Sequence, residues 1–350
     1  HWLGGMGILV FILAILPGTD GSTYHLFKFE SPGPQVGKLA SKVRHTATIL
    51  YLIYLAMTLL QFFLLLCGGI GFFHSAIIAM GTAGTGGFAA TGLSIGEFDN
   101  LYVEIVVTVF MFLFSLNFNL YYLIILRHVK VALMDEEFHF YCGYVVAATL
   151  AIAVNLIGTY GNFAEALRYA SFTVVSLTSS TGFSTTDFSQ WPQFSQTILM
   201  LCMAFGACAG STGGGLKASR VLVLIKAGKA QLYRVLRPHG VQVVRMNGKA
   251  FGEENVTGVV RYFLVYAMLF VVAVVLLSLD GFDFLTNFTS VLTCISNDGP
   301  GLGQIVGPYG SFAGFSPFGK ILLSVMMLAG RLELFPLLLL FLPSTWKKNY

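Results

Sequence analysis

Long apolar runs separated by short polar segments follow one another along the chain of 350 residues. Runs at 47–67, 101–126, 141–157, 198–224, 262–279 and 318–342 suit membrane-spanning helices, because about 20 apolar residues cross about 30 Å of hydrocarbon. Shorter apolar runs at 71–81, 164–177 and 284–294 are too short to cross as helices. The pattern predicts an all-α polytopic membrane protein in which full spans alternate with half-helices that enter the membrane and turn back.

Each short apolar run is followed by a turn rich in glycine and in hydroxyl or amide side chains. Residues 82–88 read TAGTGGF, residues 179–186 read SSTGFSTT and residues 296–303 read SNDGPGLG. Irregular backbone at membrane depth must be buried in protein or must line a water-filled path. A ring of carbonyl and hydroxyl oxygens can replace the water shell of a monovalent cation. We interpret the turns as parts of one selectivity filter; ordinary helix-connecting turns are the alternative for any one of them alone.

The turns supply a defined set of candidate ion-binding residues. Glycine can adopt positive φ and turn its carbonyl inward, and threonine or serine adds a hydroxyl oxygen to the same lining. In the first turn two adjacent glycines leave the choice of the filter glycine open, and in the third turn an aspartate and a proline flank the glycine. The candidates are Thr85, Gly86, Gly87, Ser180, Thr181, Gly182, Asn297, Asp298 and Gly299.

Composition and charge agree with a membrane protein. Apolar residues make up 56% of the chain and charged residues 10%, whereas soluble domains carry about 25% charged residues. Most basic residues fall in stretches at 28–44, 127–130, 217–261 and 347–348, which is the positive-inside pattern of an inner membrane. The net charge of +4 therefore indicates topology, and no nucleic-acid partner is expected.

The opposite side of the membrane is predicted to carry acidic residues. They are Glu97, Asp99, Glu165, Asp187, Asp280, Asp283 and Asp298. An acidic mouth raises the local concentration of cations, although mildly acidic outer loops are also common without such a role.

No constellation of catalytic residues is present, and residues 210–217, GSTGGGLK, lack the Gly-Lys-Ser/Thr order of a phosphate-binding loop. An enzyme is not expected.

Arg331 lies deep in the last apolar run. A charge at that depth costs several kcal/mol unless it is paired, so it normally faces the bundle interior or a cavity. Glu333 is two residues away and would point elsewhere on a helix. The sequence predicts that Arg331 contacts the glycine-rich interruption of the fourth long run, at 206–217, and acts as an electrostatic barrier beneath the filter; capping of carbonyls at a helix end is the alternative.

Four motifs in order resemble the Trk/Ktr/HKT superfamily of potassium transporters, most closely its bacterial TrkH/TrkG branch. They are the Gly-Phe turns, WLGGMG at 2–7, GSTGGG at 210–215 and LAGRLELFP at 328–336. The resemblance implies four helix–pore loop–helix (M1-P-M2) repeats around a central pore. Each repeat would give one glycine to a potassium site, here Gly87, Gly182 and Gly299. The interruption would be the intramembrane gate, comprising Gly206, Gly210, Ser211, Thr212, Gly213, Gly214, Gly215 and Lys217 together with Arg331.

The resemblance also implies a division of the chain into repeats. By this alignment the chain is truncated at its N-terminus and starts in the last helix of the first repeat. The expected parts are the end of M2 of repeat 1 (1–17), a cytoplasmic loop (18–45), repeat 2 (46–126), a cytoplasmic loop (127–137), repeat 3 with a broken M2 (138–225, break at 206–217), a cytoplasmic loop (226–257), repeat 4 (258–343) and a cytoplasmic tail (344–350).

The implied function is potassium uptake across the bacterial inner membrane through the channel-like pore subunit of a Trk-type system. K⁺ is the expected bound ion, with no covalent cofactor. The expected partners are a second copy of the chain and a peripheral cytosolic nucleotide-binding subunit of the TrkA type, which would dock at residues 226–237; membrane lipid headgroups suit that basic stretch equally well. The alternative is a Na⁺- or H⁺-coupled secondary transporter with a midplane site between broken helices, for which Glu104, Arg331 and Glu333 are the candidates.

Overall fold

The computed structural model describes residues 1–7, 43–237 and 243–331, and regular structure in these ranges is helical apart from one short hairpin. Several predicted parts lie wholly or partly outside the described residues: 8–17 of the part predicted at 1–17, 18–42 of the loop predicted at 18–45, the end of repeat 4 from 332 on with Glu333, and the tail predicted at 344–350. The longer helices are α4 (Val43–Cys67), α5 (Phe72–Ala83), α6 (Leu101–Phe114), α7 (Phe118–Ile125), α9 (Glu136–Tyr160), α10 (Phe163–Thr178), α11 (Gln193–Ala204), α12 (Ala218–Leu236), α13 (Glu253–Leu277), α14 (Phe284–Ser296) and α15 (Pro317–Arg331). Shorter elements are α1 (Trp2–Gly5), α8 (Val129–Leu133), the 3₁₀ helices η1 (Ser94–Phe98), η2 (Phe188–Gln190), η3 (Ser278–Asp280) and η4 (Phe312–Gly314), and strands β1 (Arg245–Met246) and β2 (Lys249–Ala250).

Capping residues set the ends of several helices. Asp135 accepts a hydrogen bond from the Phe138 N–H at 2.9 Å at the start of α9, and Gly161 ends this helix in the left-handed conformation with φ of 71°. Asp283 starts α14 by accepting from the Thr286 N–H at 3.1 Å. Such caps pair backbone groups that the first and last helical turns leave without partners.

Three described helices are long and apolar enough to cross a membrane: α4, α9 and α13. α6 and α7 form a fourth candidate only when they are taken together, since they meet at an angle of 88°. The single returning span predicted at 101–126 is therefore wrong in shape. The chain bends because Asn117 caps α7 by accepting from the Asn119 N–H at 2.9 Å, and because the Phe118 N–H bonds the Gly210 carbonyl oxygen at 3.0 Å instead of continuing α6.

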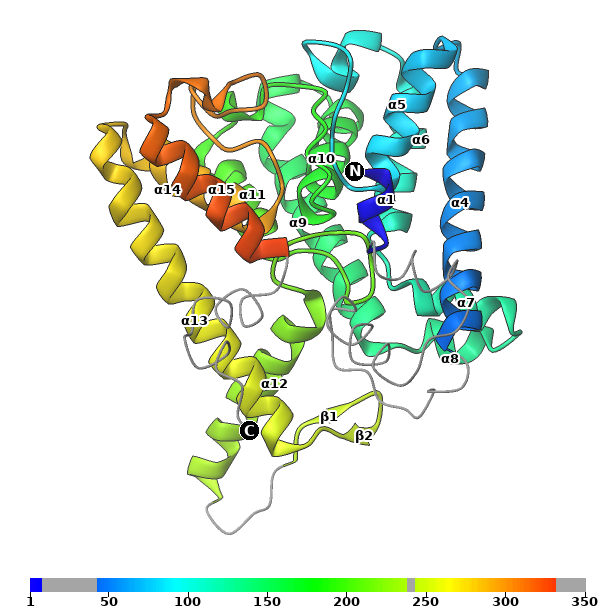
Figure 1. Ribbon diagram of the computed structural model, residues 1–350, viewed down its shortest axis with the longest axis vertical. Coiled ribbons are helices and arrows are strands. Elements are labelled where there is room, and N and C mark those ends of the chain that lie inside the picture. The colour runs from blue at the N-terminus through cyan, green and yellow to red at the C-terminus, as the bar shows by residue number, and fades with distance from the viewer. Residues whose placement is uncertain (8–42, 238–242, 332–350) are drawn as a thin grey trace, which may run out of the picture.

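The half-helices α5, α10 and α14 occupy the positions of the short apolar runs. α5 packs on α4, α10 packs on α9, and α14 packs between α13 and α15. In Figure 1, α4 and α5 lie along one edge of the molecule and α13, α14 and α15 along the other, with α9, α10 and α11 between them. This arrangement brings the ends of the half-helices toward the centre of the bundle.

The helix predicted to break at 206–217 is divided into α11 and α12, with no helix between Ala204 and Ala218. α12 continues as far as Leu236, so the first part of the loop predicted at 226–257 is helical, and β1 and β2 form the hairpin beyond it. α12 and the hairpin lie at the lower end of the view in Figure 1. Lys226 holds this end to α9 through an ion pair with Glu136 and a hydrogen bond of 2.8 Å to the Arg245 carbonyl.

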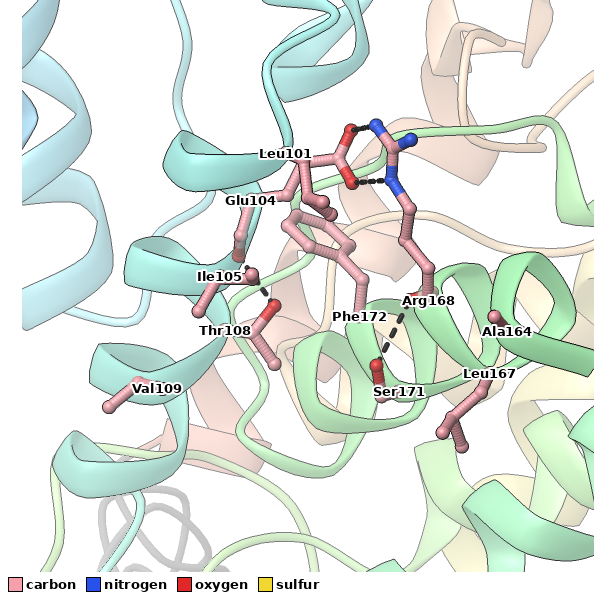
Figure 2. Close-up of a pocket in the computed structure, with 10 residues that line it drawn as sticks. All are labelled: Leu101, Glu104, Ile105, Thr108, Val109, Ala164, Leu167, Arg168, Ser171 and Phe172. Atoms are coloured by element: carbon pink, nitrogen blue, oxygen red, sulfur yellow. Dashed lines mark hydrogen bonds and ion pairs between the residues drawn. The ribbon is translucent and has the colours of Figure 1, made fainter. Parts of the chain in front are cut away.

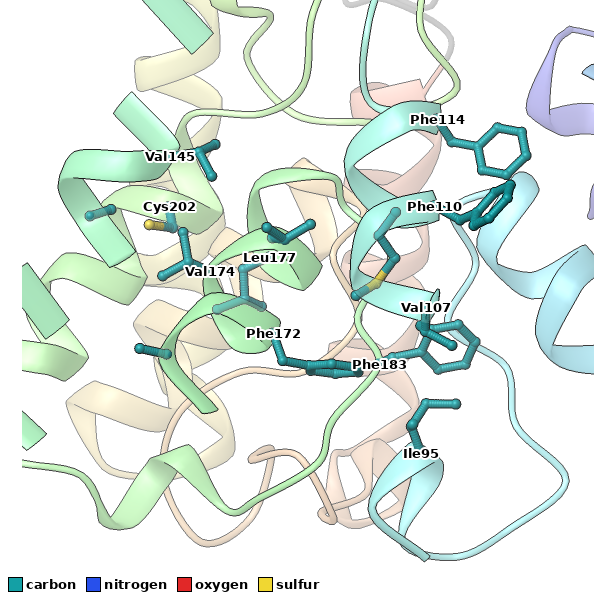
Figure 3. Close-up of a cluster of buried hydrophobic side chains, with 14 of the residues drawn as sticks. Ile95, Val107, Phe110, Phe114, Val145, Phe172, Val174, Leu177, Phe183 and Cys202 are labelled. Atoms are coloured by element: carbon teal, nitrogen blue, oxygen red, sulfur yellow. The ribbon is translucent and has the colours of Figure 1, made fainter. Parts of the chain in front are cut away.

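A cluster of buried apolar side chains fills the space between α6, α9, α10 and α11 (Figure 3). Phe183, which directly follows a predicted filter glycine, is 1% exposed and lies beside Phe172 from α10. Close packing of large side chains gains many small dispersion contacts and resists displacement. The cluster therefore holds the second turn in place through Phe183.

Candidate functional site

The three glycine-rich turns share one backbone conformation. Thr85, Ser180 and Asn297 adopt φ of 52°, 57° and 59°, and the glycine two positions further on has φ of 62°, 81° or 96°. Those glycines are Gly87, Gly182 and Gly299. Positive φ is rare for residues other than glycine, so this repeated pair of left-handed positions marks equivalent turns.

Backbone hydrogen bonds confirm the correspondence between the turns. The Gly86 N–H donates to the Gly81 carbonyl at 2.7 Å, and the Thr181 N–H donates to the Ser176 carbonyl at 2.9 Å. In the third turn, the Asp298 N–H donates to Thr293 at 3.0 Å. Gly86, Thr181 and Asp298 are thus equivalent positions, so Gly87 rather than Gly86 corresponds to Gly182 and Gly299.

The turns lie directly against one another. A Cβ atom added to Gly87 would stand 2.0 Å from the Thr181 carbonyl oxygen, and one added to Gly182 would stand 2.1 Å from the Asp298 carbonyl oxygen. Each of these glycines therefore touches the neighbouring turn at the residue before its own glycine, and a side chain there would collide with backbone. At Gly299 an added Cβ would have no atom of the described residues within 4 Å.

Each turn follows the C-terminal end of a half-helix. α5 ends at Ala83, α10 at Thr178 and α14 at Ser296, so the negative ends of three helix dipoles lie next to the turns. The partial negative charge of these helix ends favours a cation beside the turns.

The broken segment between α11 and α12 contacts all three turns. The Thr212 carbonyl oxygen accepts from the Thr85 Oγ1 hydroxyl at 2.8 Å, and the Gly214 N–H donates to Ser180 Oγ at 2.9 Å. A Cβ added to Gly213 would lie 2.8 Å from the Ser179 carbonyl oxygen, and one added to Gly214 would lie 2.4 Å from the Ser296 carbonyl oxygen. Glycine is required here because the segment passes close under the turns.

Arg331, at the end of α15, joins the broken segment to the first helix. Its Nη1 donates to the Thr212 carbonyl oxygen at 2.9 Å, and its Nη2 donates to the Gly4 and Gly5 carbonyl oxygens at 2.9 and 3.2 Å. The predicted contact with the broken segment is present, and so is the alternative contact with carbonyls of a helix, here α1.

Glu137 is part of this site, although the sequence analysis does not select it. Its side chain is buried, and Oε1 accepts hydrogen bonds from the Ala209 N–H at 2.6 Å and the Ser219 N–H at 3.0 Å. One carboxylate therefore joins the broken segment, at Ala209, to the first turn of α12, at Ser219. In the sequence, Glu137 reads as an ordinary acidic residue in the first turn of a helix, where acidic residues are common; an acidic residue directly before a long apolar run was the available signal.

One of the predicted acidic positions, Asp298, has different surroundings from those expected. Glu97, Asp99, Glu165 and Asp283 are exposed, as a mouth requires, but Asp298 is only 2% exposed and belongs to the interior. The sequence placed Asp298 in both the mouth and the filter, and burial rules out the mouth.

Glu104 is engaged by Arg168, whose Nε and Nη2 donate to the two carboxylate oxygens at 2.6 and 2.7 Å (Figure 2). This pair links α6 to α10 above an apolar pocket. A carboxylate held in this way has no spare oxygen directed at the turns, so Glu104 is a poor candidate for an ion-coupling residue.

The half-helices end in adjoining glycine turns inside an apolar bundle, next to a broken helix. This arrangement is that of a pore-forming polytopic membrane protein. A family model of TrkH, described as a cation transport protein, matches residues 1–160 and 144–348. The chain belongs to this family.

Individual relatives resemble nearly the whole chain. The Trk system potassium uptake protein TrkH of Salmonella typhimurium is 35% identical over 99% of this chain and 72% of its own length. The Trk system potassium uptake protein TrkG of Escherichia coli is 30% identical, with the same coverage. The crystal structure of the potassium transporter TrkH from Vibrio parahaemolyticus matches with a TM-score of 0.84 and 32% identity, over 99% of this chain and 71% of that one. These proteins are named as transporters, in agreement with the prediction that this chain is not an enzyme.

Proposed function

We propose that this protein takes up potassium across the bacterial inner membrane as the pore subunit of a Trk-type system. The observation that carries the proposal is the repeated turn: Gly87, Gly182 and Gly299 share positive φ, and the first two pack against the next turn in order. Relatives support the proposal, because similar proteins are named potassium uptake proteins.

Ion passage would use the backbone of the turns. Carbonyl and hydroxyl oxygens at the level of Gly87, Gly182 and Gly299 would replace the water of a K⁺ ion, and the helix dipoles of α5, α10 and α14 would favour its charge. Glycine is needed at Gly87 and Gly182 because the neighbouring carbonyls leave no room for a side chain. No side chain of the described residues has to change its covalent state, so transport requires only binding, dehydration and release.

The broken segment at 206–217 would act as the gate, and Arg331 as a positive barrier. The segment lies against the turns through Thr212 and Gly214, so an ion leaving the filter on this side would meet it first. Opening would require the Thr212 carbonyl to leave Thr85 and Arg331, which together hold it in place.

Growth of cells that lack their own potassium uptake tests the function. The protein should restore growth at low K⁺, and Gly182→Ala should abolish it, because the added Cβ would stand 2.1 Å from the Asp298 carbonyl oxygen and φ is +81°. Gly143→Ala is the control, since an added Cβ there meets nothing within 4 Å. Rescue by Gly182→Ala at normal membrane abundance would refute the filter assignment.

Ion-coupled transport is a second candidate because one carboxylate, Asp298, is buried beside the turns. Coupling requires a group that binds the driving ion, and an aspartate at membrane depth suits that role. The two functions differ in liposomes. Potassium flux through a uniport follows the K⁺ gradient alone, whereas a coupled transporter moves K⁺ against its gradient when a Na⁺ or H⁺ gradient is imposed.

The proposed partners are a second copy of the chain and a nucleotide-binding regulatory subunit on the cytosolic side. The support for a docking surface is α12, whose end combines Lys229 and Arg234 with the exposed apolar side chains Leu232, Val235 and Leu236. Replacing these three apolar residues by serine should reduce regulation by the partner while leaving K⁺ flux of the isolated protein intact, which flux assays with and without the partner measure. Loss of both would contradict a docking role.

A further inference from the structure

The bend between α6 and α7 interrupts the hydrogen-bond ladder of a span that hydropathy predicts to be continuous. α6 ends at Phe114 and α7 begins at Phe118, so only residues 115–117 lie between them. In a continuous helix each N–H donates to the carbonyl four positions earlier. Phe118 would then bond the Phe114 carbonyl, and Asn119 would bond the carbonyl of the residue after it. The bend breaks both bonds.

The broken segment supplies other partners for the carbonyls at the end of α6. The Phe114 carbonyl oxygen accepts from Thr212 Oγ1 at 3.1 Å. The Ser115 carbonyl oxygen accepts from the Cys208 N–H at 3.0 Å. Both donors belong to the segment at 206–217, so this segment occupies the two acceptors that α7 would use in a straight helix.

The start of α7 is bound to the same segment. The Phe118 N–H donates to the Gly210 carbonyl oxygen at 3.0 Å, and the Asn119 N–H donates to Asn117 Oδ1 at 2.9 Å. A Cβ added to Gly210 would lie 2.8 Å from Asn117 Oδ1, so the Asn117 side chain lies directly against the segment. Asn117 therefore caps α7 and contacts the segment at the same time.

Tyr121 stabilises the bend from within the two helices. Its hydroxyl on α7 donates to the Leu113 carbonyl oxygen on α6 at 2.6 Å. The two residues are eight positions apart, which is a rise of about 12 Å along a straight helix. A tyrosine hydroxyl does not span that distance, so this hydrogen bond is possible only while the helices are bent.

Backbone groups at membrane depth need hydrogen-bond partners, because little water is available there. If the broken segment left and the bend stayed, the carbonyls of Phe114 and Ser115 and the N–H of Phe118 would all lose their partners. If α6 and α7 joined instead, Phe118 would bond Phe114 and Asn119 would bond Ser115. The groups that the segment releases are therefore partners for one another and for the first turn of α7.

We propose that the α6–α7 junction is a switch coupled to the broken segment, bent while the segment is docked and joined into one helix when the segment moves aside. This inference rests on the proposed function, in which the segment is the gate. The joined form is the single span that the apolar run at 101–126 predicts, and α6 and α7 together are long and apolar enough to cross a membrane. Asn117 is a positioning residue for the docked segment, and any change that favours the joined helix favours the open gate.

The distance between α6 and α7 tests the coupling directly. Spin labels on cysteines that replace Ile105 and Ile125 report it, because these side chains are 54% and 60% exposed. Serine replaces Cys67 and Cys142, the native cysteines that are not buried. At 1.5 Å per residue a joined helix separates the two labelled positions by about 30 Å, whereas the bend of 88° holds them closer together.

Gly214→Ala should displace the segment without altering the junction, because the added Cβ would lie 2.4 Å from the Ser296 carbonyl oxygen. We expect the label distance to lengthen toward the value of the joined helix. Gly143→Ala, where an added Cβ meets nothing within 4 Å, should keep the shorter distance. An unchanged distance in Gly214→Ala would overturn the proposal. The measurement needs no K⁺ flux, so its outcome is independent of the proposed function.

Two substitutions at Asn117 test the consequence for transport. Both remove the cap and the contact with Gly210, but alanine favours a continuous helix, whereas proline lacks the N–H and clashes with the preceding turn of such a helix. The bent form accepts the proline ring, because Asn117 has φ of −64°. K⁺ flux into liposomes, normalised to folded protein, should be severalfold higher for Asn117→Ala than for Asn117→Pro. Equal flux in the two variants, or the reverse order, would overturn the proposal.

Tyr121→Phe provides an independent measurement that leaves the cap intact. Loss of the hydroxyl removes the hydrogen bond to Leu113, which exists only in the bent form, so K⁺ flux should rise. Tyr122→Phe is the control on the same helix, since the Tyr122 hydroxyl makes no hydrogen bond among the described residues. Flux of Tyr121→Phe no higher than that of Tyr122→Phe would overturn the proposal. Absence of K⁺ flux in the wild type would instead count against the proposed function.

Discussion

Arg331 and Thr212 lie 119 positions apart in the sequence, and the Arg331 guanidinium donates to the Thr212 carbonyl oxygen at 2.9 Å. The same oxygen accepts the Thr85 hydroxyl at 2.8 Å. One carbonyl thereby joins the first turn, the broken segment and the end of α15. This junction places a positive charge at the point where the segment meets the turns.

Arg331→Ala should increase K⁺ flux. Removal of the charge would lower the proposed electrostatic barrier, and removal of the hydrogen bonds to Thr212, Gly4 and Gly5 would loosen the segment. A barrier lowered by about 1.4 kcal/mol raises a rate about tenfold. Flux into liposomes, normalised to the amount of folded protein, is the measurement.

Arg331→Lys separates the two contributions, because lysine keeps the charge but lacks the planar fork of donors. We expect its flux to lie between those of the wild type and Arg331→Ala. Unchanged flux in a well-folded Arg331→Ala variant would remove the barrier role.

Glu137→Ala should destabilise the closed segment. The substitution leaves the Ala209 and Ser219 N–H groups without their shared acceptor. A buried donor that loses its partner costs about 1–3 kcal/mol. The thermal midpoint in detergent should fall, and flux under non-activating conditions should rise. Glu136→Gln is the matched control, because this neighbour pairs with Lys226 at the surface instead. Equal thermal midpoints and equal flux under non-activating conditions for the two variants would show that Glu137 does not hold the segment.

The Glu104–Arg168 pair should couple α6 to α10 energetically. The Glu104 side chain is 5% exposed and that of Arg168 is 25% exposed, so loss of either partner leaves the other charge poorly solvated. A double-mutant cycle with Glu104→Gln and Arg168→Met should give a coupling free energy of about 1–3 kcal/mol. Additive losses of stability would mean that the pair contributes nothing beyond its separate side chains.

Asp283 should make the start of α14 sensitive to acid. The hydrogen bond from the Thr286 hydroxyl, aided by the Thr286 N–H, lowers the pKa of this carboxyl below its usual value. A carboxyl with a lower pKa in the folded state stabilises the fold above the unfolded-state pKa of about 3.9. That contribution is lost as the pH falls through the folded-state pKa.

Comparison of two variants tests this cap. Asp283→Ala should cost about 1 kcal/mol at pH 7, whereas Asp283→Asn should retain most of the cap. The stability difference between wild type and Asp283→Asn should shrink below about pH 4. A difference that stays constant from pH 7 to pH 3 would exclude the charged cap.

The half-helices could be predicted because their signals are local. A short apolar run that ends in glycine and threonine specifies a helix too short to cross and a turn that needs positive φ, and α10 and α14 lie close to the predicted runs at 164–177 and 284–294. The positions of the three turns could be predicted from the same local pattern. The break at 206–217 could also be predicted, because glycines disfavour helix.

Other features depended on partners far away in the sequence. The bend between α6 and α7 depends on a bond from Phe118 to Gly210, and hydropathy alone favoured one span there. The helical path of α12 through the predicted loop, the role of Glu137 and the burial of Asp298 likewise depend on neighbours that no local pattern identifies.

The sequence by itself determined the class of the protein, the long spans α4, α9 and α13, the half-helices and the glycine turns, because hydrophobic length and backbone freedom are properties of contiguous residues. Tertiary structure alone decided that Gly87 is the equivalent of Gly182, that Arg331 meets Thr212, and that Asp298 is enclosed while Glu165 is exposed. The physical reason is that the energy of a charge or a carbonyl depends on what lies within a few ångströms of it, and in this protein those neighbours come from segments far apart in the sequence.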